Sequence, residues 1–316
     1  MTLLELIIAC AILLILCSAA LPLTRIIVVR HRKQELRRLG YAGIADYYIA
    51  SVNYLPHAAD GYIPAREASM KALQLDENLA EAHASLGFVH FQYDWNWDAA
   101  EKEFRRSIEL SPSYATAHHW YGYLLAIQGR CDESLRESRT AMQSDPLAMM
   151  IRTQLAATLF WCGQKEASID ELKRVVEMSP DFVRGHNYLS IGYVAQGKCN
   201  DAMAEYQKSL KLTEGAAERE LTAFDAFLNA HCGRPQEARR ILQLLRESQP
   251  TARPLEYYVI AEVEVALGER EAAFRDLAEA ERHHTNFMVL LKIDPWLVPL
   301  HSDPRFQQLL HRMNLS

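Results

Sequence analysis

The chain lacks the short motifs by which many enzymes are recognised. Its 316 residues contain no Gly-rich phosphate loop, no nucleophile elbow and no zinc signature with two histidines around a glutamate. The adjacent pairs His118-His119 and His283-His284 point to different helix faces, so each pair makes a poor two-ligand metal site. We therefore expect no catalytic residue, no metal and no cofactor. An enzyme with an unrecognised site remains an open alternative.

An excess of positive charge is also missing. The net charge of the whole chain is -6. The first forty residues carry six Lys and Arg against Glu5 and Glu35, so the remainder carries a net charge of -10. An acidic body of this kind argues against nucleic acid as a partner.

Ionisable side chains are almost absent from the opening stretch. The run from Leu3 to Leu23 contains only Glu5, and as a helix it would span roughly 30 Å, enough to cross a bilayer. A carboxylate in hydrocarbon costs about a few kcal/mol unless it has a partner. The nearest cation on the same chain is the Met1 α-amine, which points along the helix axis, so a neighbouring copy is the better donor. The stretch therefore predicts assembly.

The residues Met1-Thr2-Leu3-Leu4-Glu5-Leu6, followed by the apolar run and Pro22, resemble the mature start of type IV pilins and type II secretion pseudopilins. The resemblance covers about the first fifty residues, although Met1 replaces the usual Phe and Leu14 replaces a common Gly. It implies a prepilin peptidase, the pilus assembly machinery, N-methylation of Met1, pairing of Glu5 with an adjacent Met1, and bending at Pro22. A plain membrane anchor is the alternative.

An internal period of 34 residues runs through the body of the chain. Prolines and glycines recur in phase, and a small residue and a mostly bulky apolar residue keep fixed places before each repeat end. This period resembles tetratricopeptide (TPR) repeats, helix hairpins that stack into a right-handed solenoid, over about residues 80–285. The residues in phase are Pro112, Pro146 and Pro180; Gly129, Gly163 and Gly197; Ala100, Ser134, Ser168, Ala202, Ala238 and Ala273; and Phe104, Ser138, Leu172, Tyr206, Leu242 and Leu277.

The predicted fold class is therefore all-α: a long N-terminal pilin-like helix, then a TPR α-solenoid of about six helix hairpins with a C-terminal cap. The cap should cover the open end of the solenoid. The expected divisions are 1–55 for the pilin-like helix, with 1–29 as its apolar assembly or transmembrane segment, 56–79 for a half repeat packed on that helix, 80–285 for the solenoid and 286–316 for the cap.

Four cysteines lie at related places in the repeats. Cys131 and Cys199 each open the second helix of a repeat, and Cys162 and Cys232 each close the first helix of the following repeat. In a stack of antiparallel hairpins these positions are neighbours, so we expect disulfides between Cys131 and Cys162 and between Cys199 and Cys232. Such bonds persist in an oxidising compartment. Buried free thiols are the alternative.

The first helices of the repeats should form a concave groove that holds a peptide or protein ligand, through residues such as His119, Tyr123 and Asn187. The preferred function is nevertheless structural: a homopolymer subunit of an extracellular pilus-like filament, inserted in the inner membrane before assembly, with the TPR domains outside. The alternative is a membrane-anchored scaffold or minor pseudopilin that binds partner proteins.

Overall fold

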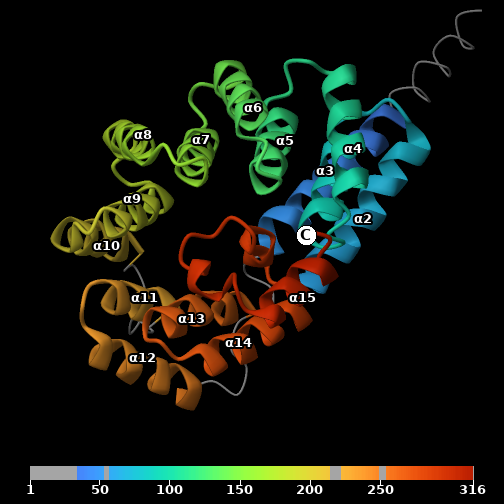
Figure 1. The fold of residues 1–316 in the computed structure, drawn as a ribbon. Coiled ribbons are helices and arrows are strands. Elements are labelled where there is room, and N and C mark those ends of the chain that lie inside the picture. Colours follow the sequence, from blue (N-terminus) through green and yellow to red (C-terminus); the bar gives the residue numbers. More distant parts are fainter. Residues whose placement is uncertain (1–33, 53–56, 214–221, 249–253, 316) are drawn as a thin grey trace, which may run out of the picture.

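The computed structural model describes residues 34–52, 57–213, 222–248 and 254–315, and within these ranges it is helical with no strand (Figure 1). The all-α prediction is therefore confirmed for this part of the chain. The expected assembly residues Met1, Glu5 and Pro22 lie outside the described residues, as does most of the expected pilin-like helix, so these assignments stay predictions.

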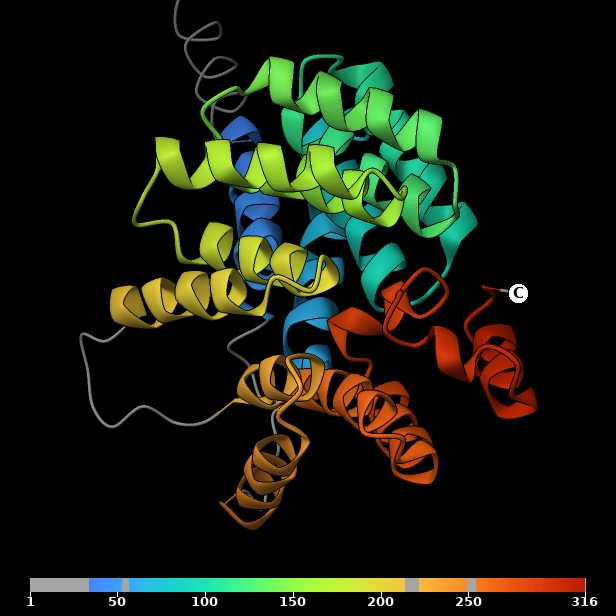
Figure 2. The ribbon, with the colours of Figure 1, turned by 60° about the vertical axis from the view of Figure 1, so that its left-hand side comes forward.

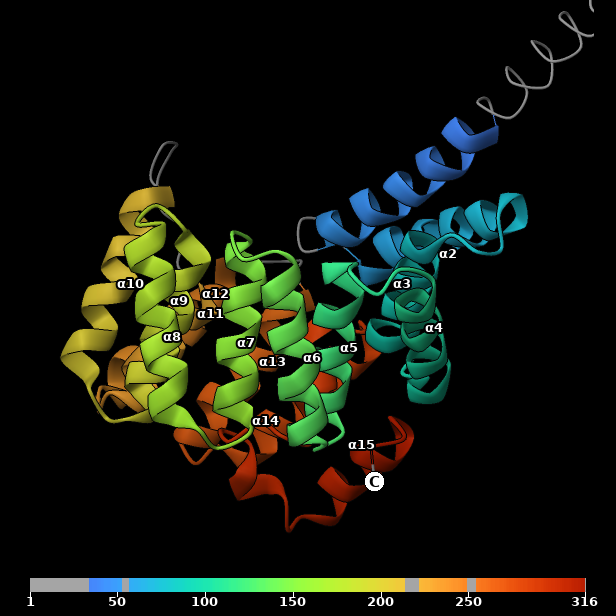
Figure 3. The ribbon, with the colours of Figure 1, turned by 90° about the horizontal axis from the view of Figure 1, so that it is seen from above.

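Six helix hairpins follow one another between residues 80 and 282, and Figure 3 shows those from α5 to α10 side by side. A single helix, α2 (Ala58–Leu75), precedes them. The hairpins are α3 (Ala80–Gln92) with α4 (Trp97–Leu110), α5 (Ala115–Ile127) with α6 (Cys131–Ser144), α7 (Met149–Trp161) with α8 (Lys165–Met178), α9 (Val183–Ala195) with α10 (Cys199–Thr213), α11 (Ala223–His231) with α12 (Pro235–Ser248), and α13 (Pro254–Ala266) with α14 (Arg270–Arg282).

The small residues of the period lie where the two helices of a hairpin cross. All six are 0 or 1% exposed, and the residues four positions later, which are mostly bulky and apolar, are also buried. In the second hairpin the Ser134 hydroxyl donates a 2.5 Å hydrogen bond to the Gly122 carbonyl of the facing helix. A Cβ at Gly122 would lie 2.8 Å from Ser138 Oγ, so the close crossing requires small residues on both helices.

The turns inside five hairpins use a glycine with positive φ, and three of these glycines belong to the 34-residue period. Such a φ is easy for glycine and strained for other residues. The first hairpin has Trp95 at its turn with a φ of 50°, and the Trp95 ring stacks on His284 at 4.4 Å. Burial of this ring helps to hold the unusual backbone. The five glycines are Gly129, Gly163, Gly197, Gly233 and Gly268.

Residues 34–51 form a helix that packs against α2 and α3. Ala42 belongs to a small core with Ala72 and Ala82, and Val52 belongs to a second core with Tyr62. The part of the chain that the resemblance assigned to the second half of a pilin helix is therefore the first partner of α2.

Two disulfides join successive hairpins. One links Cys131 at the start of α6 to Cys162 at the end of α7, and the other links Cys199 at the start of α10 to Cys232 at the end of α11. Their Cα–Cα distances are 5.7 and 5.5 Å. These are the partners that the repeat register predicts.

The solenoid closes on itself through its C-terminal segment, which comprises η2 (Asn286–Leu290), η3 (Val298–Leu300) and α15 (Pro304–Arg312). This segment lies inside the curve of the repeats and reaches the first ones (Figures 1 and 2). The Trp97 indole N–H donates to the Met313 carbonyl at 2.9 Å, and the Tyr62 hydroxyl donates to Asn286 Oδ1 at 2.8 Å. The segment thus bridges the two ends of the array, whereas the sequence predicted only a cap over the open end.

Candidate functional site

The concave face is formed by the first helices of the hairpins. Close contacts join α3 to α5, α5 to α7, α7 to α9 and α11 to α13. The three groove residues expected from the sequence lie on two of these helices, His119 and Tyr123 on α5 and Asn187 on α9. Burial, and then the positive charge of Arg184, lowers the pKa of His119 to about 4, so its ring is neutral at pH 7.

Tyr123 connects the predicted groove to a cavity on the same face. Its ring stacks on Trp161 at 5.3 Å and meets Phe91 edge-on at 4.9 Å. Trp161 in turn lines a cavity of about 150 Å³. None of the three predicted groove residues lines this cavity directly.

The cavity, which we call the aromatic cavity, lies between four hairpins and the C-terminal segment. Its wall is mostly apolar, with seven aromatic rings, and it includes two carboxylic acids. The lining residues are Ala157, Phe160, Trp161, Ser168, Leu172, Tyr188, Ile191, Gly192, Phe224, Phe227, Val259, Glu262, Phe287, Leu290, Asp294, Pro295 and Trp296.

Helical spacing explains why these side chains meet. Phe224 and Phe227 are three residues apart on α11, so both rings lie on the same face, and their centroids are 5.7 Å apart. Trp296 of the C-terminal segment packs edge-on against Phe227 at 5.3 Å and over His231 at 4.4 Å. Burial lowers the pKa of His231 to about 4, so this neighbour is neutral.

The two acids of the cavity are buried and hydrogen-bonded to each other. Glu262 lies on α13 and is 9% exposed, and Asp294 precedes Trp296 and is 3% exposed. Asp294 also accepts 2.8 Å hydrogen bonds from the Tyr258 hydroxyl and the Trp296 backbone N–H. Burial raises the pKa of Glu262 well above its ordinary value, and the charge of Asp294 raises it further. Burial also raises the pKa of Asp294, while the hydrogen bonds from Glu262, the Trp296 backbone and Tyr258 act in the opposite direction. Glu262 is therefore the donor in the hydrogen bond between the two acids.

Sequence reasoning named neither the two acids nor Trp161 or Trp296 as site residues. Tyr188 was open to prediction, because it directly follows the predicted Asn187 and lies three residues before Ile191, another lining residue, on the same helix face. The contribution of the C-terminal segment was not visible, because that segment has no repeat that fixes its register.

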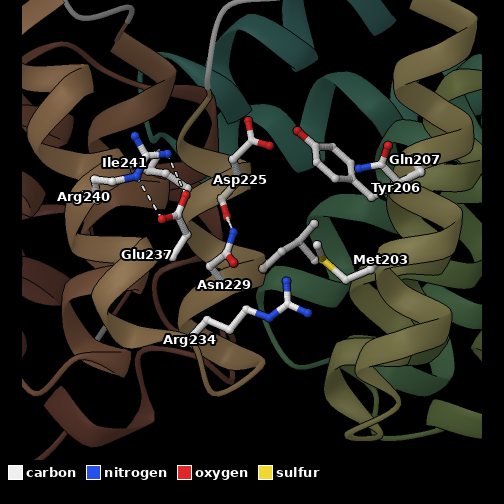
Figure 4. A pocket seen from close by; sticks show the side chains of 10 residues that line it. Met203, Tyr206, Gln207, Asp225, Asn229, Arg234, Glu237, Arg240 and Ile241 are labelled. Carbon is white, nitrogen blue, oxygen red and sulfur yellow. Dashed lines mark hydrogen bonds and ion pairs between the residues drawn. The ribbon is translucent and has the colours of Figure 1, made fainter.

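A second hollow, of about 440 Å³, opens between α10 and the hairpin of α11 and α12 (Figure 4). Met203 and Tyr206 face it from α10, and Asn229 faces it from α11. Arg240 on its far wall is paired with Glu237. We call this hollow the junction cleft. It is more open and more polar than the aromatic cavity.

Metal ligands do not gather anywhere in the described part of the chain: no three His, Cys, Asp or Glu side chains are placed to hold an ion. Among the helices described here, none combines the length and the apolar character needed to cross a membrane.

Two curated proteins illustrate the sequence similarity. The transcriptional regulator HilA of Salmonella typhimurium is 22% identical over 209 residues, which are 66% of this chain and 36% of HilA. Human tetratricopeptide repeat protein 6 is 21% identical over 145 residues, which are 45% of this chain and 27% of that protein. The chain spans about a third of the length of these relatives. No protein-family model matches it.

Solved structures share the fold. PilW, described as a widely conserved type IV pilus biogenesis factor, has a TM-score of 0.54 and 21% identity and covers 68% of this chain and 94% of PilW. PilF of Pseudomonas aeruginosa has a TM-score of 0.51 and 18% identity and covers 76% of this chain and 99% of PilF. Both are TPR proteins, so the predicted TPR domain is confirmed.

The predicted location in an extracellular filament, with prior insertion in the inner membrane, is wrong. The structures of the same fold are TPR proteins and not components of such a filament. The prediction depended on the apolar start of the chain, which lies outside the described residues. The comparisons likewise give no support to a homopolymer, to a membrane partner, or to the pilin and pseudopilin assignments.

Proposed function

We propose that this chain is a protein-binding scaffold. Its concave face holds a segment of a partner protein, and the aromatic cavity receives an anchoring side chain from that segment. Binding rather than catalysis is the role that we assign to the described residues.

The observation that carries this proposal is the aromatic cavity itself. Trp161, Tyr188 and Trp296 are only partly buried although they are large and apolar, and they converge from α7, α9 and the C-terminal segment. Aromatic side chains in a pocket, surrounded by a wider surface, are typical of the anchoring positions in protein interfaces. The curved surface around them supplies the wider contact that a peptide segment needs.

The test places a photo-cross-linking amino acid, p-benzoylphenylalanine, at Tyr188 in the cavity wall and, as a control, at the exposed Arg139 of α6. We expect the chain with the probe at position 188 to form an adduct of discrete mass in its native cells. The control should form none. A Trp161→Leu change in the same chain should reduce the adduct, because it removes one wall of the cavity.

The proposal fails if both positions give the same adducts, because contact would then be independent of the cavity. It also fails if position 188 gives no adduct while the variant remains folded by circular dichroism.

A further inference from the structure

The charge of the aromatic cavity is of one sign. Among the described residues that line it, Glu262 and Asp294 are the only ones of a charged type, and none is Lys, Arg or His. Within the described residues, no salt bridge joins either acid to a cation, and the Tyr258 hydroxyl and the Trp296 backbone N–H donate hydrogen bonds to Asp294. Burial raises the pKa of both acids, and the hydrogen bonds that Asp294 accepts favour its ionised form over that of Glu262, so a negative charge on the pair lies on Asp294 and is buried.

The surroundings do not neutralise this charge. Tyr258 and the Trp296 backbone donate hydrogen bonds to Asp294, which stabilise it without adding a positive charge. His301 interacts with Asp294, but burial lowers the pKa of His301, and the His231 ring behind Trp296 is neutral for the same reason. A buried negative charge beside an apolar cavity is best matched by a cation.

We propose that the aromatic cavity binds an alkylammonium group, carried by a lysine side chain of the partner protein. This inference rests on the proposed function, since it names the side chain that the cavity receives. The aromatic faces attract a cation through their quadrupoles, and they suit its methyl or methylene groups. Asp294 supplies the opposing charge.

The size of the cavity agrees with this ligand. A space of about 150 Å³ is enough for a benzene-sized group. A trimethylammonium head is of similar size. Trp161 and Trp296 stand in the wall, so occupation should change their fluorescence.

The first experiment compares two probes of nearly equal shape on the full chain: choline and its neutral isostere 3,3-dimethylbutan-1-ol. We expect choline to quench the tryptophan fluorescence at concentrations at least tenfold lower than the isostere. Equal binding of the two probes, or no binding of choline, overturns the inference.

Two variants separate charge from shape. Asp294→Asn removes the negative charge and should weaken choline binding to the level of the isostere. Glu262→Gln can still donate a hydrogen bond to Asp294 and leaves its charge in place, so choline binding should stay within about threefold of the wild type. The reverse order of effects contradicts the charge assignment. If Asp294→Asn does not fold, the comparison of probes on the wild type decides alone.

A peptide distinguishes a protein side chain from a free small molecule. The probe is an acetylated, amidated pentapeptide with trimethyllysine at its centre, and its control has norleucine there. We expect the trimethyllysine peptide to bind more tightly than choline. A peptide weaker than choline overturns the assignment to a protein side chain. The cross-linking experiment does not depend on charge, so it can succeed when this inference fails.

Discussion

At the scale of single residues, the same polar contact recurs in four successive hairpins. In each, a side chain near the start of the first helix reaches a glutamate on the second helix and a carbonyl six residues earlier. We call this contact the repeat clamp. Its members are His83 with Glu103 and the Glu77 carbonyl, His118 with Glu137 and the Pro112 carbonyl, Arg152 with Glu171 and the Pro146 carbonyl, and His186 with Glu205 and the Pro180 carbonyl.

Where the repeat clamp contains a histidine, a doubly protonated ring satisfies it best. Both ring nitrogens of His118 face acceptors, at 2.6 Å from Glu137 and 3.0 Å from the Pro112 carbonyl. A neutral imidazole has only one N–H, so an imidazolium satisfies the site better. Burial lowers the pKa of His118, but its two hydrogen bonds outweigh burial and raise that pKa above the ordinary value. The permanently charged Arg152 at the equivalent place fits this account.

We expect the clamp to make stability depend on pH. The pKa values of His83 and His118 are raised in the folded chain. Their contribution to folding stability is therefore complete below about pH 6.5, the pKa of histidine in the unfolded chain, and it is lost as the pH rises through their pKa in the folded chain. A charge-assisted hydrogen bond contributes about 1.5–3 kcal/mol. Between pH 6 and pH 8, the melting temperature of the double variant His83→Arg/His118→Arg should therefore fall less than that of the wild type. Circular dichroism melts at several pH values measure this.

The control is His311→Arg, which adds the same charge at an exposed position of α15. It should follow the wild-type pH profile. If the double variant follows that profile too, the clamp does not titrate in this range. The clamp was open to prediction, because its glutamates recur 34 residues apart and its histidines and arginine recur 34 or 35 residues apart, in phase with the glycines and prolines of the period.

At the scale of helices, the stacking of hairpins is uneven. Successive first helices pack closely from α3 to α9 and again from α11 to α13, but α9 and α11 do not, and the junction cleft opens there. The Cys199–Cys232 disulfide crosses this junction, whereas Cys131–Cys162 joins helices that already pack closely. The two bonds should therefore differ in what they restrain.

Replacing either cysteine pair by alanine should lower the free energy of unfolding by about 2–4 kcal/mol, since the separations of 31 and 33 residues are nearly equal. The local effect should differ. Loss of Cys199–Cys232 should raise hydrogen exchange in α10 and α11, whereas loss of Cys131–Cys162 should leave α6 and α7 well protected. Mass-spectrometric exchange under non-reducing conditions measures both. Equal changes at the two junctions would contradict this difference.

The sequence revealed the hairpins because their pattern is local and periodic. Within one repeat, a small residue such as Ser134 indicates where two helices cross, and a turn glycine such as Gly129 indicates where a helix ends. The aromatic cavity has no such local signal. Phe160, Tyr188 and Trp296 meet only because the array curves and the C-terminal segment enters the curve. A curvature that accumulates over several repeats cannot be read from any one of them.

At the scale of the whole molecule, the closure of the array couples its two ends. One hydrophobic core combines the first hairpins with the last hairpin and the C-terminal segment. Phe91 and Leu124 come from the first two hairpins, Leu277 comes from the last hairpin, and Leu309 and Met313 come from the C-terminal segment. In a linear solenoid, each repeat is stabilised only by contacts with the adjacent repeats. Here the C-terminal segment gives the first repeats a second neighbour.

A substitution at the C-terminus should therefore loosen the start of the array. Met313→Ala, at a fully buried position, should lower the free energy of unfolding by about 2–5 kcal/mol. Hydrogen exchange should rise in α4, whose Trp97 bonds to the Met313 carbonyl, while α7 and α8 change little. Leu135→Ala is the matched control, because its core contains only residues of the second and third hairpins. It should raise exchange in α6 and α7 and spare α4. An effect of Met313→Ala confined to α14 and α15 would show that the ends are independent, and the aromatic cavity would then lack the rigid wall that its binding role requires.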